Sequence, residues 1–174
     1  MRGRISRRTW MVIGVLLIAG APIAWYLGSP LFINRVVDEP FPITTDTPTG
    51  GATPADATGG TVVARGTFAG GDDFHKGSGT ATVYRAGQTL ILRFDAFTVT
   101  NGPDLHVILT KHASPKTSKD VDNGYLEVAK LKGNSGGQNY TLPAGVNLGE
   151  YRTVVIYCKP FHVVFATAPL STSN

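Results

Sequence analysis

The chain has 174 residues, of which 42% are hydrophobic and 16% are charged, and its formal net charge is +4. Four arginines near the start account for this excess, since the remainder of the chain holds 12 basic and 12 acidic residues. These four are Arg2, Arg4, Arg7 and Arg8. A neutral folded part argues against nucleic-acid binding, which requires a basic face on the domain itself. We therefore expect no nucleic-acid partner and interpret the basic start as a membrane-topology signal.

Residues 1–9 are predicted to be a cytoplasmic basic N-terminus, and residues 10–33 a transmembrane helix. Residues 10–27 carry no charge, and a run of this length is about what crosses a bilayer core of roughly 30 Å. Because the arginines precede the run, we expect a single-pass protein of the cell membrane with its domain on the extracytoplasmic face. A cleaved signal peptide is the alternative. The length of the run and the position of Pro22 favour an uncleaved anchor.

Residues 34–60 are predicted to form a disordered linker. Four prolines, Pro40, Pro42, Pro48 and Pro54, stand there among threonine, glycine, alanine and aspartate, without hydrophobic periodicity. Segments of this composition behave as flexible or extended tethers.

Residues 61–170 consist of short runs of alternating polar and apolar residues separated by turn signals, a pattern typical of strands. No segment has a sustained helical period. The fold class predicted from this spacing is all-β: a β-sandwich of about eight short strands, with a barrel as the alternative. The strands are expected at 61–68, 79–85, 89–97, 104–110, 124–131, 138–142, 151–157 and 161–166. Residues 171–174 are expected to be a tail.

Cys158 is the only cysteine in the chain. Val154, Ile156 and Cys158 alternate along one face of a predicted strand, which places the thiol at the inward end of that strand. Pro160 interrupts the ladder just beyond it. A lone cysteine of this kind is a small buried hydrophobe, a reactive thiol or a metal ligand, and all three interpretations stay open.

Four further residues are candidate neighbours of this thiol: His75, Asp104, His106 and His162. Asp104 and His106 share a strand face, although Asp104 also suits a turn cap after Pro103. His75 lies in a glycine-rich loop, where it can point into a pocket or simply face solvent. One cysteine with two of the histidines could form a copper-type site. The domain has no methionine to complete such a site, so we leave the metal unknown.

The sequence around Ser135, Gly-Asn-Ser-Gly-Gly, looks like the nucleophile loop of chymotrypsin-type serine proteases. That chemistry needs a histidine base on a separate strand of a double barrel. His106 and His112 are too close in sequence to Ser135 for that architecture. We interpret the motif as a glycine-rich turn and do not expect an enzyme.

Taken together, these stretches resemble the DM-thirteen domain, an electron-transfer module also found in Skeletor-type proteins. The resemblance covers the whole predicted sandwich and is carried by Gly66-Thr67-Phe68, His75 with Gly79, residues 102–107 (GPDLHV) and residues 154–161 (VVIYCKPF). It implies a β-sandwich outside the cell, often beside haem-binding or membrane redox modules. It also implies that Cys158 is the redox-active residue. His162 is a candidate from its position alone, not from the family.

The function we predict is a membrane-anchored extracytoplasmic electron-transfer or redox accessory centred on Cys158. A lone thiol has no resolving partner with which to close a disulfide. Electron transfer therefore predicts a bound metal or haem, or a mixed disulfide with a redox protein partner. The alternatives are a non-catalytic binding or scaffolding β-sandwich with a buried structural cysteine, and a metal-binding module.

Overall fold

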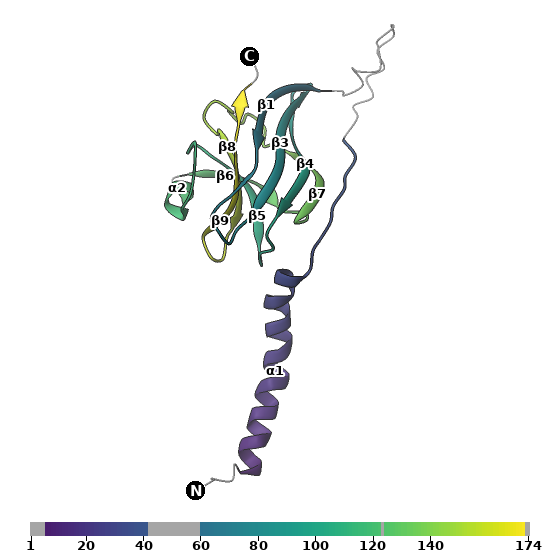
Figure 1. Ribbon diagram of the computed structural model, residues 1–174, viewed down its shortest axis with the longest axis vertical. Helices are drawn as coiled ribbons and strands as arrows, with labels where there is room; N and C mark the ends of the chain where they lie inside the picture. Colours follow the sequence, from purple (N-terminus) through teal and green to yellow (C-terminus); the bar gives the residue numbers. More distant parts are fainter. Residues whose placement is uncertain (1–5, 42–59, 123, 173–174) are drawn as a thin grey trace.

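The computed structural model describes residues 6–41, 60–122 and 124–172. The chain begins with α1 (Arg7–Phe32), which corresponds to the predicted helix over 10–33 and projects away from the rest of the molecule (Figure 1). The transmembrane assignment of this helix is not supported. Among the described residues, no helix combines the length and the apolar character needed to cross a membrane.

Two five-stranded antiparallel sheets form most of the remaining described residues, in agreement with the predicted all-β class. The first sheet has the order β10-β1-β3-β4-β7 and the second β2-β9-β8-β5-β6. The strands of the first sheet are β1 (Thr61–Thr67), β3 (Gly77–Ala86), β4 (Thr89–Val99), β7 (Ser135–Thr141) and β10 (Ser171–Thr172). Those of the second are β2 (Ala69–Gly70), β5 (Leu105–Thr110), β6 (Tyr125–Lys130), β8 (Thr153–Cys158) and β9 (Val163–Pro169).

The main core lies between the sheets and is built from the longer strands, in which inward-facing residues alternate with outward-facing ones as on β8. On β8, Val154, Ile156 and Cys158 face this core. Val155 and Tyr157 face the other side of the same strand, where they join a smaller cluster with Val121 of the short helix α2 (Ser118–Asp122). Strand β8 is therefore buried along its whole length.

Two very short strands account for the difference between the eight predicted strands and the ten observed. Strand β2 pairs with β9, and β10 pairs with β1 through Ala64–Thr172 and Arg65–Ser171. The predicted tail thus begins with a sheet-edge strand, and residues 173–174 lie outside the described part. Strands of two residues carry no detectable alternation, so only their pairing partners reveal them.

The prediction of a disordered linker is wrong at its beginning. Residues 34–41, here called the N-terminal strap, run alongside β7 and form a parallel bridge between Val36 and Ser135. The amide of Val37 donates to the carbonyl of Ser135 at 2.9 Å, and the amide of Glu39 donates to that of Gly137 at 2.8 Å. The strap thus covers the β7 edge of the first sheet, a row of backbone groups that would otherwise be unpaired. Residues 42–59 lie outside the described part.

Side chains reinforce the strap along its length. The carboxylate of Glu39 accepts hydrogen bonds from Lys132 Nζ at 2.8 Å and from the backbone amide of Asn139 at 2.9 Å. Burial by itself would raise the pKa of Glu39, but these bonds hold it below its ordinary value. Phe41 packs edge-on against Tyr84, with ring centroids 4.6 Å apart.

The glycine-rich motif around Ser135 makes room for the strap. A Cβ atom at Gly133 would overlap the carbonyl oxygen of Arg35, and one at Gly136 would overlap that of Val37. Ser135 itself serves as a backbone partner of the strap. The motif therefore has a structural explanation in strand pairing: Ser135, Gly136 and Gly137 belong to β7, so the prediction that they form a turn is wrong.

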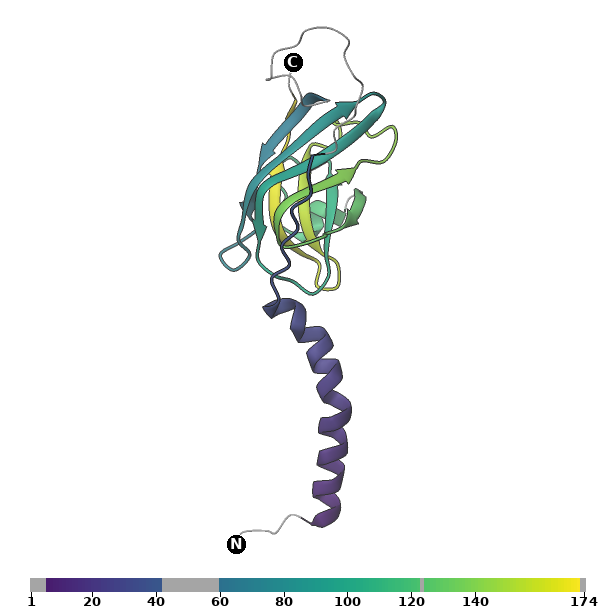
Figure 2. The same ribbon diagram turned by 90° about the vertical axis from the view of Figure 1, so that its right-hand side faces the viewer.

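The strap starts at the end of the sandwich where Cys158 lies. Just after α1, the side-chain oxygen of Asn34 accepts hydrogen bonds from Asn101 at 2.9 Å and from Asn134 at 3.2 Å. Both views show the turn between β8 and β9 at the end of the sandwich nearest α1 (Figures 1 and 2). The strap and its helix thus meet the sandwich at the end that holds the candidate thiol.

Candidate functional site

Cys158 is the last residue of β8 and has no solvent-exposed surface. It pairs with Leu105 of β5 on one side and with Val163 of β9 on the other. Its side chain belongs to the main core. The predicted position, at the inward end of the strand, is confirmed.

The sulfur of Cys158 is nevertheless not surrounded by carbon alone. It accepts hydrogen bonds from the backbone amides of Phe161 and Asp104, which lie in the turn after β8 and in the loop before β5. Burial raises the pKa of the thiol above its ordinary value, and the two amide bonds counteract this only in part. The nearby negative charge of Asp104 adds to the rise. The resting group is therefore a protonated thiol at neutral pH.

Asp104 and His106 do share a face, as predicted, with His106 Nε2 3.2 Å from Asp104 Oδ2. The other ring nitrogen, Nδ1, lies 2.7 Å from Glu127 Oε1 on β6. Two lysines complete the network: Lys130 Nζ is 2.6 Å from Asp104, and Lys159 Nζ is 2.8 Å from Glu127. The hydrogen bond from Lys130 lowers the pKa of Asp104, and that from Lys159 lowers the pKa of Glu127.

This network lies on the opposite face of the second sheet from the thiol. His106 alternates with Leu105 and Val107, which face the main core as Cys158 does. His106 is thus engaged by two carboxylates away from the sulfur, and Asp104 links the network to Cys158 through its backbone amide. Sequence reasoning missed Glu127 and Lys130 because they become neighbours of His106 and Asp104 only through the pairing of β6 with β5.

His75 lies in the loop between β2 and β3 and stabilises that loop. Its Nδ1 atom is 2.7 Å from Asp72 Oδ2, while its backbone amide donates to Asp72 Oδ1 at 2.7 Å. These bonds lower the pKa of Asp72 to about 2. The imidazole also packs against the ring of Phe165 in a tilted arrangement, with centroids 4.1 Å apart. His75 thus covers a core aromatic at the Cys158 end of the sandwich and has its own carboxylate partner.

His162 is exposed and has a φ of +53°, an uncommon value for a residue other than glycine. Its Nδ1 atom lies 3.2 Å from the hydroxyl of Tyr157, which is also 3.4 Å from Asp122 Oδ1. Burial raises the pKa of Tyr157 to about 12, and the charge of Asp122 adds to this rise. His162 is therefore directed to the Tyr157 side of β8 and not to the thiol.

These placements do not fit a metal or haem centre at Cys158. The sulfur has backbone amides as its polar neighbours, while His75, His106 and His162 each have partners elsewhere. In the part of the chain that the structure describes, no group of three or more histidine, cysteine, aspartate or glutamate side chains is arranged to hold a metal ion.

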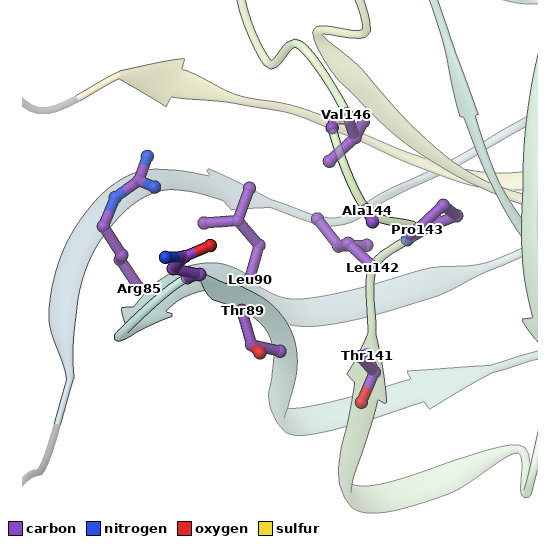
Figure 3. Close-up of a pocket in the computed structure, with 10 residues that line it drawn as sticks. Arg85, Thr89, Leu90, Thr141, Leu142, Pro143, Ala144 and Val146 are labelled. Atoms are coloured by element: carbon purple, nitrogen blue, oxygen red, sulfur yellow. The ribbon is translucent and has the colours of Figure 1, made fainter.

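A cavity of about 350 Å³ lies at the other end of the sandwich (Figure 3). It is formed by the turn between β3 and β4 and by the loop that follows β7, and Arg85 is the one charged residue among those lining it. Leu90, Leu142 and Val146 provide much of its apolar wall. Strands β4 and β7 extend between this cavity and the Cys158 end, so a molecule bound in the cavity would not contact the thiol.

Comparison with protein families now identifies the domain. A family model described as "Electron transfer DM13" matches residues 67–170. The chain belongs to this family. The matched DM13 region spans more than half of the chain and includes Cys158, Asp104 and the turn after β8, whereas the N-terminal strap and most of β1 precede it. No match was found among curated proteins or among solved structures. The electron-transfer description of the DM13 family supports a redox role for this chain.

Proposed function

We propose that this DM13 protein is an extracytoplasmic, membrane-anchored redox accessory and that Cys158 is its reactive group. The observation that carries the proposal is the pair of backbone amides, from Phe161 and Asp104, that donate to the Cys158 sulfur. Hydrogen bonds to sulfur stabilise its negatively charged form, the thiolate that takes part in disulfide exchange. A cysteine that served only as a small apolar side chain would need no such donors.

The chemistry that fits this environment is thiol–disulfide exchange with a redox protein partner. Cys158 loses its proton to solvent, its thiolate attacks a disulfide of the partner, and one partner sulfur leaves as a thiolate. A mixed disulfide remains, and no further oxidant is consumed. Because the sulfur is fully buried, the turn of residues 159–162 has to open before the exchange. The raised pKa of the thiol keeps the closed form unreactive.

A second candidate function is a binding or scaffolding module in which Cys158 is structural. The observation that favours it is the complete burial of the side chain within the main core. In this case the sulfur contributes packing, and its removal affects stability alone.

Native-state thiol labelling of the full-length protein distinguishes the two. The redox proposal predicts that a small aromatic disulfide reacts with Cys158 much faster than the protein unfolds globally. It also predicts that a disulfide-linked partner is captured from membranes and is missing for Cys158→Ser. The matched control is Ile156→Val, a core truncation on the same strand that leaves the thiol in place. Labelling no faster than global unfolding, with no captured partner, would establish the structural function instead.

The membrane location rests on the sequence and on the surface of α1. The large apolar side chains of Trp10, Val15, Leu17 and Ile18 are each more than half exposed on this helix. Exposed apolar surface of this extent requires cover by lipid or by another chain. Fractionation of cells expressing the full chain tests this part of the proposal. Recovery in the soluble fraction, or resistance of the domain to protease added outside the cell, would contradict it.

A further inference from the structure

Tyr157 and His162 form a hydrogen-bonded pair at the surface of the second sheet, next to the thiol but on the other side of the strand. The phenol ring of Tyr157 is 1% exposed and belongs to the smaller cluster under α2. Its hydroxyl lies 3.2 Å from His162 Nδ1. The imidazole itself is exposed, so this pair connects a buried phenol to solvent through a single side chain.

The backbone at His162 is held in an unusual conformation that presents the ring to the phenol. A φ of +53° is disfavoured for histidine and is tolerated where the surrounding structure fixes it. The amide of His162 donates to the carbonyl of Lys159 at 3.4 Å, which closes the turn. The two rings meet nearly edge-on, with an interplanar angle of 82°.

Two further groups face the phenol from neighbouring elements. The Tyr157 hydroxyl also donates to Asp122 Oδ1 of α2 at 3.4 Å, a longer contact than the one to His162, and the ring of Tyr125 on β6 is 6.1 Å from that of Tyr157. The second phenol is close enough to extend an electron path towards the β6 edge.

We propose that Tyr157 is a one-electron redox centre of this protein and that His162 accepts its proton. The proposal deepens the electron-transfer function and rests on it, but it does not use the thiol. A lone thiol offers two-electron exchange, whereas a phenol with a hydrogen-bonded base offers a one-electron couple.

Electrons and protons balance between the Tyr157–His162 pair and one external oxidant. A strong one-electron oxidant takes one electron from Tyr157, and the hydroxyl proton moves to Nδ1 of His162. The products are a neutral phenoxyl radical, an imidazolium and the reduced oxidant. Returning the electron and the proton restores the starting state. Because the imidazole is exposed, its proton can exchange with water.

The test uses the full-length protein with ruthenium(III) tris-bipyridine, generated by a light flash, as the oxidant. The phenoxyl radical is followed by its visible absorption and by electron paramagnetic resonance. We expect a phenoxyl signal in the wild-type protein that is clearly diminished in Tyr157→Phe, which preserves the ring. Tyr84→Phe, which removes a phenol from the other sheet, is the matched control and should leave the signal unchanged.

His162→Asn tests the proton acceptor, because asparagine tolerates positive φ but does not take up a proton at neutral pH. We expect radical formation to slow by roughly tenfold or more, as for the loss of a positioned base. Deuterated water should slow the wild-type reaction and not that of His162→Asn. Circular dichroism of each variant establishes that the fold is retained.

The outcomes separate this inference from the thiol proposal. An undiminished radical in Tyr157→Phe, or an unchanged rate in His162→Asn, would overturn the inference whatever Cys158 does. A radical that depends on Tyr157 and His162 and persists in Cys158→Ser would support the inference even if no disulfide-linked partner were found.

Discussion

Replacing Gly136 with alanine should release the N-terminal strap from the sandwich. Gly136 has a φ of +96°, and an added Cβ would overlap the carbonyl oxygen of Val37. Gly124 provides a matched control: its φ is +95°, and nothing lies within 4 Å of the Cβ that alanine would add. Both substitutions impose similar backbone strain, of about 1–2 kcal/mol. The difference between them therefore isolates the contact with the strap.

The size of that difference follows from the bonds that the strap would lose. Two backbone hydrogen bonds, from Val37 and Glu39, contribute about 0.5–1.5 kcal/mol each. The Glu39 carboxylate adds its bonds to Lys132 and to the amide of Asn139, discounted because Glu39 is partly exposed to solvent. We expect Gly136→Ala to be less stable than Gly124→Ala by about 2–4 kcal/mol.

Urea denaturation followed by circular dichroism gives the two free energies of unfolding. Hydrogen exchange gives the local result, since the amides of Val37 and Glu39 should lose protection in Gly136→Ala and keep it in Gly124→Ala. Equal destabilisation of the two variants, with both amides still protected, would show that the strap does not depend on the absence of a side chain at Gly136.

Two further predictions concern groups whose partners the structure reveals. Gln138→Leu should destabilise the protein by about 2–4 kcal/mol in urea denaturation, because it leaves the buried amide of Gly133 and the hydroxyl of Tyr140 without their side-chain partner. A loss of stability below about 1 kcal/mol would mean that water takes the place of the Gln138 side chain. The loop held by Asp72 and His75 should loosen in acid, because the pKa of Asp72 is lowered to about 2 in the folded protein. The Asp72 carboxylate therefore stabilises the fold fully above the ordinary carboxyl pKa, and this stabilisation is lost as the pH falls through the pKa of the folded state. Carboxyl chemical shifts measured by nuclear magnetic resonance would show this titration, and an ordinary midpoint for Asp72 would contradict it.

Much of the second sheet could be predicted from short-range pattern alone. The alternation of Val154, Ile156 and Cys158 with Val155 and Tyr157 is a property of consecutive residues, and strand geometry converts it directly into two faces. Whether both faces would be buried could not be predicted, because burial of the outer face depends on α2, which contributes Val121. The same limit applies to His162: its spacing from Cys158 suggested a shared site, but the turn directs it to Tyr157.

The sequence by itself determined the all-β class, the approximate positions of the longer strands and the inward direction of the thiol, because each depends on the order of neighbouring residues. Only the tertiary structure decided what surrounds that thiol and where the segment after α1 lies. The amide of Asp104 reaches the sulfur through the pairing of β5 with β8, and Val36 reaches Ser135 across 99 positions of the chain. Such contacts depend on how distant strands are ordered and registered, and local periodicity carries no information about either.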